Sequence, residues 1–293
     1  VFAESGATSA DLNRLAEVGL VILGETEIWR DPLEKLQPVL TRSPVLTSHQ
    51  QEVWQEIHNQ LMDASTRKPN LLVGVTGSGK TEIYLRAAAA VLETGRGVFI
   101  LVPEISLTPQ TVKRFFARFP GKVGLIHSKL SPGERYDTWR RIRAGLLPIV
   151  VGPRSALFSP LPDPGLIVID EAHDASYRQE DTQPHYHTVQ CALLLSQINS
   201  ACLLLGSATP DVETLYQFEQ NHWRVHRLPR RILAHTAWNG KEPETVPPLF
   251  TDLPRVEVVD MRRELSAGNR SAISQALHTA LENLMQRDEQ AIL

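Results

Sequence analysis

Glycine, lysine and threonine residues with the spacing of a phosphate-binding loop occur in the stretch LLVGVTGSGKTEIYL, residues 71–85. The spacing is Gly-x-x-x-x-Gly-Lys-Thr, and it lies between an apolar run and a helical pattern. Glycines let backbone N–H groups approach phosphate oxygens closely, and the following helix offers its positive N-terminal end. Lys80 is predicted to reach the β- and γ-phosphates of ATP, and the Thr81 hydroxyl to ligate Mg²⁺. The predicted ATP-binding residues of this loop are Gly74, Thr76, Gly77, Ser78, Gly79, Lys80 and Thr81.

An acidic pair follows a second apolar run in the sequence LIVIDEAH. Asp170 is predicted to hold the Mg²⁺ shell, and Glu171 to orient and deprotonate the attacking water. The alternative is that the pair supplies only helix N-terminal charge. A kinase or G protein has no need of an imidazole at His173. This side chain is predicted to couple the γ-phosphate to the stretch GSATP, whose Ser207 and Thr209 would report the nucleotide state.

Strand, loop and helix patterns alternate from residue 70 onward and position these groups. Continuous apolar runs suit strands buried on both faces, and helices between them imply parallel pairing. The predicted strands are LLVGV, VFILV, VGLIH, PIVVG, LIVID and ACLLLG. Thr47 or Ser48 is predicted to cap a helix that ends near Leu61, and SPGE at residues 131–134 predicts a capping box. The fold class is therefore α/β.

Both ends of the chain show weaker patterns. A short helix is predicted at residues 11–18, followed by a small two-stranded wing at LVIL and EIWR. Prolines punctuate a linker before the α/β region. After WRVHRL the sequence is polar and irregular, and a strand at RVEVVDM and a helix at residues 271–287 are predicted beyond it.

Composition limits the classes of protein that the chain can belong to. The 293 residues are 42% hydrophobic with a net charge of −3, so a nucleic-acid surface must be a local patch. Cys191 and Cys202 lie in apolar runs and form no disulfide or metal framework, which points to a reducing cytosol. No apolar run approaches the roughly 18 residues that a membrane span requires.

The order of the phosphate loop, D-E-A-H and S-A-T resembles the first motor lobe of superfamily 2 helicases. Three further stretches are similar to the PriA family of replication-restart helicases within that superfamily: LVPEISLTPQ, GPRSALFSP and DEAHDASYRQED. The stretch DMRRELSAGNRSAIS also resembles the passage toward that family's second lobe. The resemblance covers nearly the whole chain and implies a RecA-like P-loop NTPase lobe with a parallel sheet, preceded by the end of a winged-helix-like domain.

The resemblance implies roles for further residues. Gln50 would read the adenine, and Lys80 and Glu171 would be the catalytic residues. Aromatic rings after D-E-A-H can stack on unpaired bases of any sequence. Phosphate contacts position a strand without reading its sequence. The implied DNA-binding residues are Ser106, Thr108, Arg154, Ser155, Tyr177 and Tyr186. The chain departs from the family at Ala172, where a second glutamate is usual, and at HYHTVQ, where the family has YHARD.

The resemblance also divides the chain. Residues 1–31 would end a winged-helix-like DNA-binding domain, 32–46 would be a linker, and 47–229 would form the ATP-binding lobe. Residues 230–254 would be a second linker, and 255–293 would begin the second helicase lobe. We interpret the chain as a piece of a longer protein, in which the family's zinc-binding cysteines would follow.

The function implied is an ATP- and Mg²⁺-dependent 3′-to-5′ DNA helicase that remodels stalled or abandoned replication forks and initiates primosome assembly. The implied partners are forked and single-stranded DNA, primosome and helicase-loading proteins, and single-stranded-DNA-binding protein, in the bacterial cytoplasm at the nucleoid. This piece alone should bind ATP with little turnover, because the arginine that stabilises the transition state would come from the second lobe. The alternatives are another superfamily 2 duplex translocase, or a non-catalytic ATP-gated DNA-binding adaptor.

Overall fold

The computed structural model describes residues 8–22, 29–32, 43–103, 109–234, 249–251, 256–287 and 290–291. Buried strands form the core of the α/β region. Within these residues, seven parallel strands form one sheet in the order β3-β4-β2-β5-β8-β1-β9. The strands are β1 (Asn70–Gly74), β2 (Gly97–Leu101), β3 (Val123–Leu125), β4 (Ile149–Gly152), β5 (Pro164–Ile169), β8 (Cys202–Ser207) and β9 (Arg224–Leu228). The six predicted strands and the parallel sheet are confirmed, and β9 adds a seventh strand at one edge.

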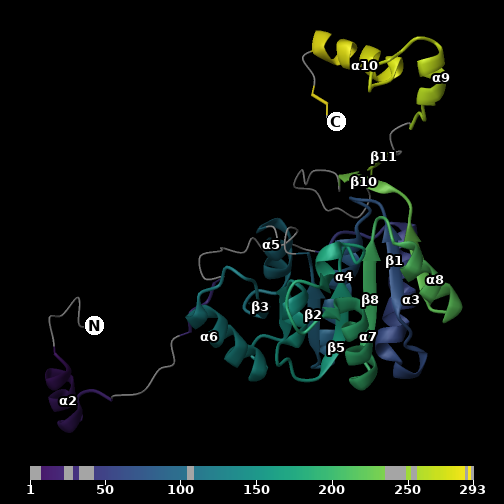
Figure 1. The fold of residues 1–293 in the computed structure, drawn as a ribbon. Coiled ribbons are helices and arrows are strands. Elements are labelled where there is room, and N and C mark those ends of the chain that lie inside the picture. The colour runs from purple at the N-terminus through teal and green to yellow at the C-terminus, as the bar shows by residue number, and fades with distance from the viewer. Residues whose placement is uncertain are drawn as a thin grey trace. The chain divides into compact units, whose positions relative to one another are not determined.

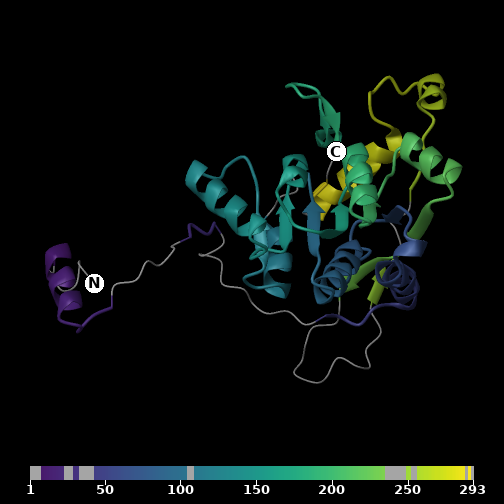
Figure 2. The same cartoon turned by 90° about the horizontal axis from the view of Figure 1, so that it is seen from below.

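Helices cover both faces of this sheet, and the central strands β2, β4, β5 and β8 are accordingly buried and almost wholly apolar (Figures 1 and 2). They are α3 (Ser48–Met62), α4 (Lys80–Glu93), α5 (Pro109–Arg118), α6 (Pro132–Arg143), α7 (Thr188–Ile198) and α8 (Val212–Gln220). On β2, Val98 and Ile100 pack with α3, α4 and α5, whereas Phe99 and Leu101 pack with α6, α7 and α8. Alternate residues of one strand thus enter two separate apolar cores.

The helix starts follow local capping chemistry. Thr47 and Ser131 each accept a hydrogen bond from the backbone N–H three residues on, and Gln50 and Glu134 return the bond. Both ends are therefore capping boxes, and the box predicted at Ser131 is confirmed. Short 3₁₀ turns, η1 (Ala64–Thr66), η3 (Arg154–Phe158) and η4 (Ala175–Tyr177), join the longer elements.

Two small antiparallel pairs lie outside the main sheet: β6 (Arg178–Gln179) with β7 (Tyr186–His187), and β10 (Arg231–Ala234) with β11 (Leu249–Thr251). The second pair lies in the segment that the sequence predicts to be irregular. Near the N-terminus, α2 spans Ser9–Glu17 and is followed by Gly19 with φ of 72°. Residues 23–28 of the predicted wing lie outside the described part, and its described ends, 20–22 and 29–30, are not strands.

Contacts divide the chain into two compact units, Val1–Thr251 and Asp252–Leu293. In the second unit, α9 (Met261–Ser266) and α10 (Gln275–Gln286) are helical. The strand predicted at RVEVVDM is wrong: residues 256–260 form no strand, and Val256 and Val258 are exposed. The described residues of this unit contain no neighbouring strand that could form hydrogen bonds with the backbone N–H and C=O groups of an extended segment. No helix in the described part of the chain is long and apolar enough to cross a membrane.

Candidate nucleotide-binding site

The phosphate loop joins the carboxyl end of β1 to the first residue of α4. Gly77 and Gly79 have φ of 81° and 89°, the left-handed region that a side chain disfavours. A Cβ on Gly79 would collide with the Gln50 carboxamide, so the close approach also requires glycine there. Ser78 is buried, and its hydroxyl has no hydrogen-bond partner among the described residues. A loop of this shape, with a buried polar atom left over, suits a polyphosphate.

Lys80 is held inside this loop. Its ammonium group donates to the Gly74 carbonyl oxygen at 2.7 Å and lies 3.6 Å from a Glu171 carboxylate oxygen. The side chain is only 7% exposed. Thr81, the next residue, is half-buried, whereas Thr76 on the rim of the loop is exposed. Thus the phosphate loop and the acidic pair, 90 positions apart in sequence, meet at the lysine.

Asp170 follows β5 and is surrounded by donors and charge. One carboxylate oxygen accepts from the Tyr84 hydroxyl at 3.0 Å and from the Glu171 N–H at 3.1 Å. Burial, and next the negative charge of Glu171, raise the pKa of Asp170, although Tyr84 and Lys80 oppose the shift. Two neighbouring carboxylates on a buried edge are the oxygen donors that Mg²⁺ takes beside nucleotide phosphates. The residues present therefore fit a magnesium–nucleotide complex.

A chain of polar contacts leads from Glu171 to the next strand. Glu171 itself has φ of 46°, an uncommon conformation for a residue with a side chain. His173 Nδ1 lies 3.7 Å from the Glu171 carboxylate and 2.8 Å from the Ser207 hydroxyl. The Thr209 N–H donates to that hydroxyl at 3.1 Å. The structure thus brings the His173 and Ser207 side chains together and joins Thr209 to them through its backbone N–H.

Tyr177 does not occupy the place that base stacking requires. The side chain is 1% exposed, and its hydroxyl donates to the Asp170 carbonyl oxygen at 2.6 Å. The Thr188 hydroxyl in turn donates to the Tyr177 carbonyl oxygen at 2.7 Å. The prediction that Tyr177 stacks on DNA bases is wrong for this structure, because the side chain is buried in the apolar core. Tyr177 instead supports the backbone that carries the acidic pair.

Of the remaining DNA-binding candidates, some lie within the described residues and two lie outside them. Arg154 donates from one guanidinium nitrogen to the carbonyl oxygens of Ser176 and Arg178, at 2.8 Å each. Ser155 is exposed beside it, and half-buried Tyr186 packs edge-on against Phe158 with ring centroids 5.1 Å apart. The candidates that lie outside the described residues are Ser106 and Thr108.

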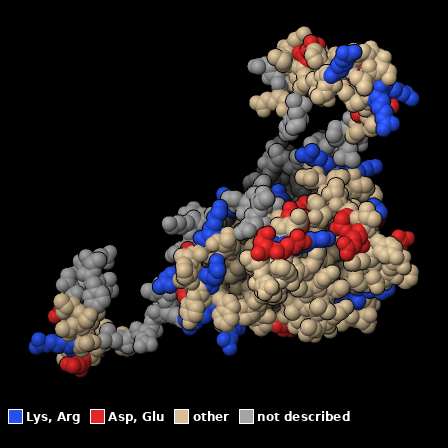
Figure 3. Space-filling view, viewed as in Figure 1, with Lys and Arg blue, Asp and Glu red and all other residues tan. Residues whose placement is uncertain are grey.

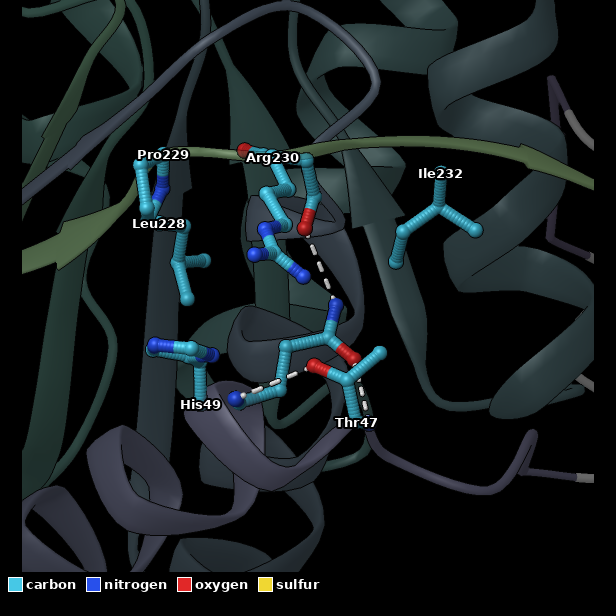
Figure 4. Close-up of a pocket in the computed structure, with 8 residues that line it drawn as sticks. Thr47, His49, Leu228, Pro229, Arg230 and Ile232 are labelled. Atoms are coloured by element: carbon cyan, nitrogen blue, oxygen red, sulfur yellow. Dashed lines mark hydrogen bonds between the residues drawn. The ribbon is translucent and has the colours of Figure 1, made fainter. Parts of the chain in front are cut away.

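Gln50 lies at a small pocket beside the phosphate loop, shown in Figure 4. Its amide nitrogen donates to the Ser78 carbonyl oxygen at 2.9 Å, and its amide oxygen accepts from the Thr47 N–H at 3.0 Å. Arg230 points into the pocket between Leu228 and Ile232. The contact of Gln50 with adenine stays a prediction.

The part of the site that follows β9 was not predicted from the sequence. The Ile232 N–H donates to the Gly77 carbonyl oxygen at 2.9 Å, and the Arg231 side chain packs over Gly77. Strand β10 therefore contacts the phosphate loop directly. The basic run RLPRR, which overlaps the end of β9 and reaches β10, is the signal that could have indicated it.

A phosphate loop and an acidic pair on strands β1 and β5, with β8 between them, define a RecA-like ATP-binding lobe of the P-loop NTPase class. The chain belongs to the DEAD/DEAH box helicase family, because the sequence model of that family matches residues 47–218. Within the described residues, no group of three or more His, Cys, Asp or Glu side chains is arranged to hold a metal ion without a nucleotide.

Two curated relatives align with almost all of the chain. The chain is 39% identical to the replication restart protein PriA of Bacillus subtilis over 290 residues, 99% of this chain and 34% of that protein. It is 40% identical to the PriA of Synechocystis over 290 residues, 98% of this chain and 32% of that protein. The chain thus spans about a third of their length. Among solved structures it is similar to RecG bound to a three-way DNA junction, at 24% identity and a TM-score of 0.46, covering 63% of this chain and 24% of that one.

Proposed function

We propose that the chain is the ATP-binding part of a 3′-to-5′ DNA helicase that remodels stalled or abandoned replication forks and initiates primosome assembly. The proposal is supported by the two PriA relatives, which align with 98–99% of the chain. The observation that carries it is the contact of Lys80 with both the phosphate loop and Glu171. This contact supports the proposal, because ATP hydrolysis needs a cation beside the phosphates and a carboxylate near the attacking water.

The proposed chemistry assigns one task to each group. Lys80 exchanges its contact with the Gly74 carbonyl for the β- and γ-phosphates. Thr81 and Asp170 would hold Mg²⁺, and the ion would supply positive charge against the developing phosphate charge. Glu171 accepts the proton of the attacking water. The contact between His173 and Ser207 carries the nucleotide state toward Thr209, and Gln50 contacts the adenine.

We propose that DNA meets the lobe at the loops after β2 and β4, because loops at the carboxyl ends of parallel strands form the binding face of such sheets. Ser106, Thr108 and Ser155 would contact phosphates, and Tyr186 would stack on a base. Arg154 would contribute through the guanidinium nitrogens that do not bind the Ser176 and Arg178 carbonyls. Primosome and helicase-loading proteins and single-stranded-DNA-binding protein are the proposed partners, in the bacterial cytoplasm at the nucleoid. The domain division at residues 31, 46, 229 and 254 stays a prediction, as does a zinc module elsewhere in the full-length protein.

Two substitutions test the proposed chemistry. Lys80→Ala removes the cation from the phosphates, so Mg²⁺·ATP affinity measured by calorimetry should fall at least about tenfold, or roughly 1.4 kcal/mol. Lys122→Ala, at an exposed turn, is the matched control and should bind ATP like the wild type. Equal ATP affinity in Lys80→Ala and wild type would refute the site.

Glu171→Gln in the full-length protein separates binding from chemistry. The amide keeps the size of the side chain but cannot accept the proton, so ATP should bind while DNA-stimulated hydrolysis falls by roughly 10² or more. Unchanged hydrolysis would mean that Glu171 contributes only charge at the end of β5. A full-length wild-type protein that binds ATP and DNA without hydrolysis would instead be an ATP-gated adaptor.

A further inference from the structure

The outer face of α6 combines exposed aromatic rings with exposed arginines. Tyr136 is 61% exposed and Trp139 is 39% exposed. Arg135, Arg140 and Arg143 are also exposed. The other face of the helix buries Ile142 against the sheet, so this outer face is a solvent-facing surface of a well-packed element.

Rings and guanidinium groups alternate along this surface. The Arg140 guanidinium carbon lies 5.1 Å from the centroid of the Trp29 ring and 5.8 Å from that of Tyr136. The Arg143 guanidinium carbon lies 5.5 Å from the centroid of the Trp139 ring. These distances are within the range of cation–π contacts. We call these five residues the α6 surface.

Trp29 reaches the α6 surface through its two following residues. The Arg30 N–H donates to the buried Asp137 carboxylate at 3.1 Å, and Asp31 pairs with Arg141 at 2.9 Å. These bonds fix the segment against α6 and add an indole ring to the row. The Arg30 guanidinium also lies 3.8 Å from the Asp137 carboxylate, so Asp137 and Arg141 each have an ionic partner within the protein.

The charge of this part of the chain is opposite to that of the whole. Residues 109–146 contain nine Lys or Arg and only two Asp or Glu, although the chain has a net charge of −3. Of the two acids, Glu134 caps its own helix and Asp137 is buried. Figure 3 shows Lys and Arg atoms gathered over the end of the molecule where α5 and α6 lie. The α6 surface therefore presents positive charge beside partly exposed aromatic rings, each of which has a guanidinium group over one face.

We propose that the α6 surface binds single-stranded nucleic acid at a place separate from the nucleotide site. Unpaired bases stack on aromatic rings whatever their sequence, and arginines neutralise the phosphates between them. The helix follows β3 and precedes the parallel strand β4, so its C-terminal half runs to the amino-terminal edge of the sheet. Arg140 and Arg143 thus lie toward the edge opposite to the phosphate loop and to the loops after β2 and β4.

An acidic protein segment would match the charge of this surface, but its carboxylates would make no use of the partly exposed aromatic rings. The proposal goes beyond the ATPase chemistry, because binding here requires neither ATP nor Lys80. The closing experiment is therefore made without nucleotide, and Lys80→Ala should bind the oligonucleotide like the wild type. If the α6 surface does not bind DNA, the assignment of the ATP site still stands. If Lys80→Ala does not weaken ATP binding, the DNA-binding proposal still stands.

The test measures the anisotropy of a labelled oligothymidine with the chain across salt concentrations. Tyr136→Ala/Trp139→Ala should weaken binding at least about tenfold, since each stacked base contributes roughly 1–3 kcal/mol. Arg140→Gln/Arg143→Gln should reduce the slope of log affinity against log salt by about 1.4, at about 0.7 for each phosphate. Tyr136→Phe/Trp139→Phe keeps the rings and should retain binding.

The matched control is Tyr216→Ala/Arg227→Gln, which removes an exposed ring and an exposed arginine from α8 and β9. It should bind like the wild type, and thermal melts should show that every variant is folded at the temperature of the binding assay. Unchanged affinity and slope in both α6 variants would overturn the proposal. So would binding of a duplex as tight as that of oligothymidine. Displacement of the oligonucleotide by polyglutamate, with no effect of Tyr136→Ala/Trp139→Ala, would reassign the surface to acidic protein segments.

Discussion

Replacing Tyr177 with phenylalanine should destabilise the lobe although it removes a single oxygen atom. The Tyr177 hydroxyl donates to the Asp170 carbonyl oxygen at 2.6 Å, and the side chain is 1% exposed. Burial, and next the charge of Asp170, raise the pKa of this phenol, so it remains a neutral donor. A buried hydrogen bond contributes about 0.5–1.5 kcal/mol, and a carbonyl left without its partner costs about 1–3 kcal/mol. We expect a loss of about 1–2 kcal/mol in the free energy of unfolding.

The measurement is a urea titration followed by circular dichroism, with a thermal melt as a second observable. For a domain of this size, each 1 kcal/mol lowers the melting temperature by roughly 2–4 °C. The control is Tyr216→Phe, because Tyr216 is 60% exposed and makes no buried hydrogen bond in the described residues. That substitution should stay within about 0.5 kcal/mol of the wild type.

Equal stability of Tyr177→Phe and wild type would refute the reasoning, since it would mean that the hydroxyl is not needed to satisfy the Asp170 carbonyl. A stacking residue would behave differently. Phenylalanine keeps the ring, so a Tyr177 that stacked on DNA would lose neither stability nor affinity for single strands.

Two further predictions concern other buried groups. Gly206→Ala should destabilise the lobe by about 1–3 kcal/mol in thermal melts, because a Cβ there collides with the buried Tyr84 hydroxyl; an unchanged melting temperature would contradict the close approach. Burial lowers the pKa of His226 below 6.5, against the opposing charge of Glu56. The unfolded chain therefore binds the proton first as the pH falls below 6.5, so the free energy of unfolding should decrease until the pH reaches the lowered pKa. In urea titrations, the free energy of unfolding of His226→Gln should depend less on pH in this range than that of the wild type. An equal pH dependence in both proteins would refute the role of His226.

The sequence by itself determined the features that depend on a few adjacent residues. The glycine spacing from Gly74 to Gly79 specifies a loop conformation that other residues disfavour, and the loop formed as predicted. The capping box at Ser131 is equally local. The predicted strands are continuous apolar runs instead of alternating apolar and polar residues, and this pattern indicated strands buried on both faces. The parallel sheet that this implies is confirmed.

Only the tertiary structure decided the contacts between elements far apart in sequence. The position of β8 between β1 and β5 brings Lys80 to Glu171 and His173 to Ser207, and no local pattern encodes that strand order. The same tyrosine pattern after D-E-A-H fits an exposed base-stacking ring or a buried support. The choice at Tyr177 came from the apolar core that surrounds it. The order and packing of the strands determine such contacts, because each contact joins residues that are distant in sequence and depends on the positions of the elements around them.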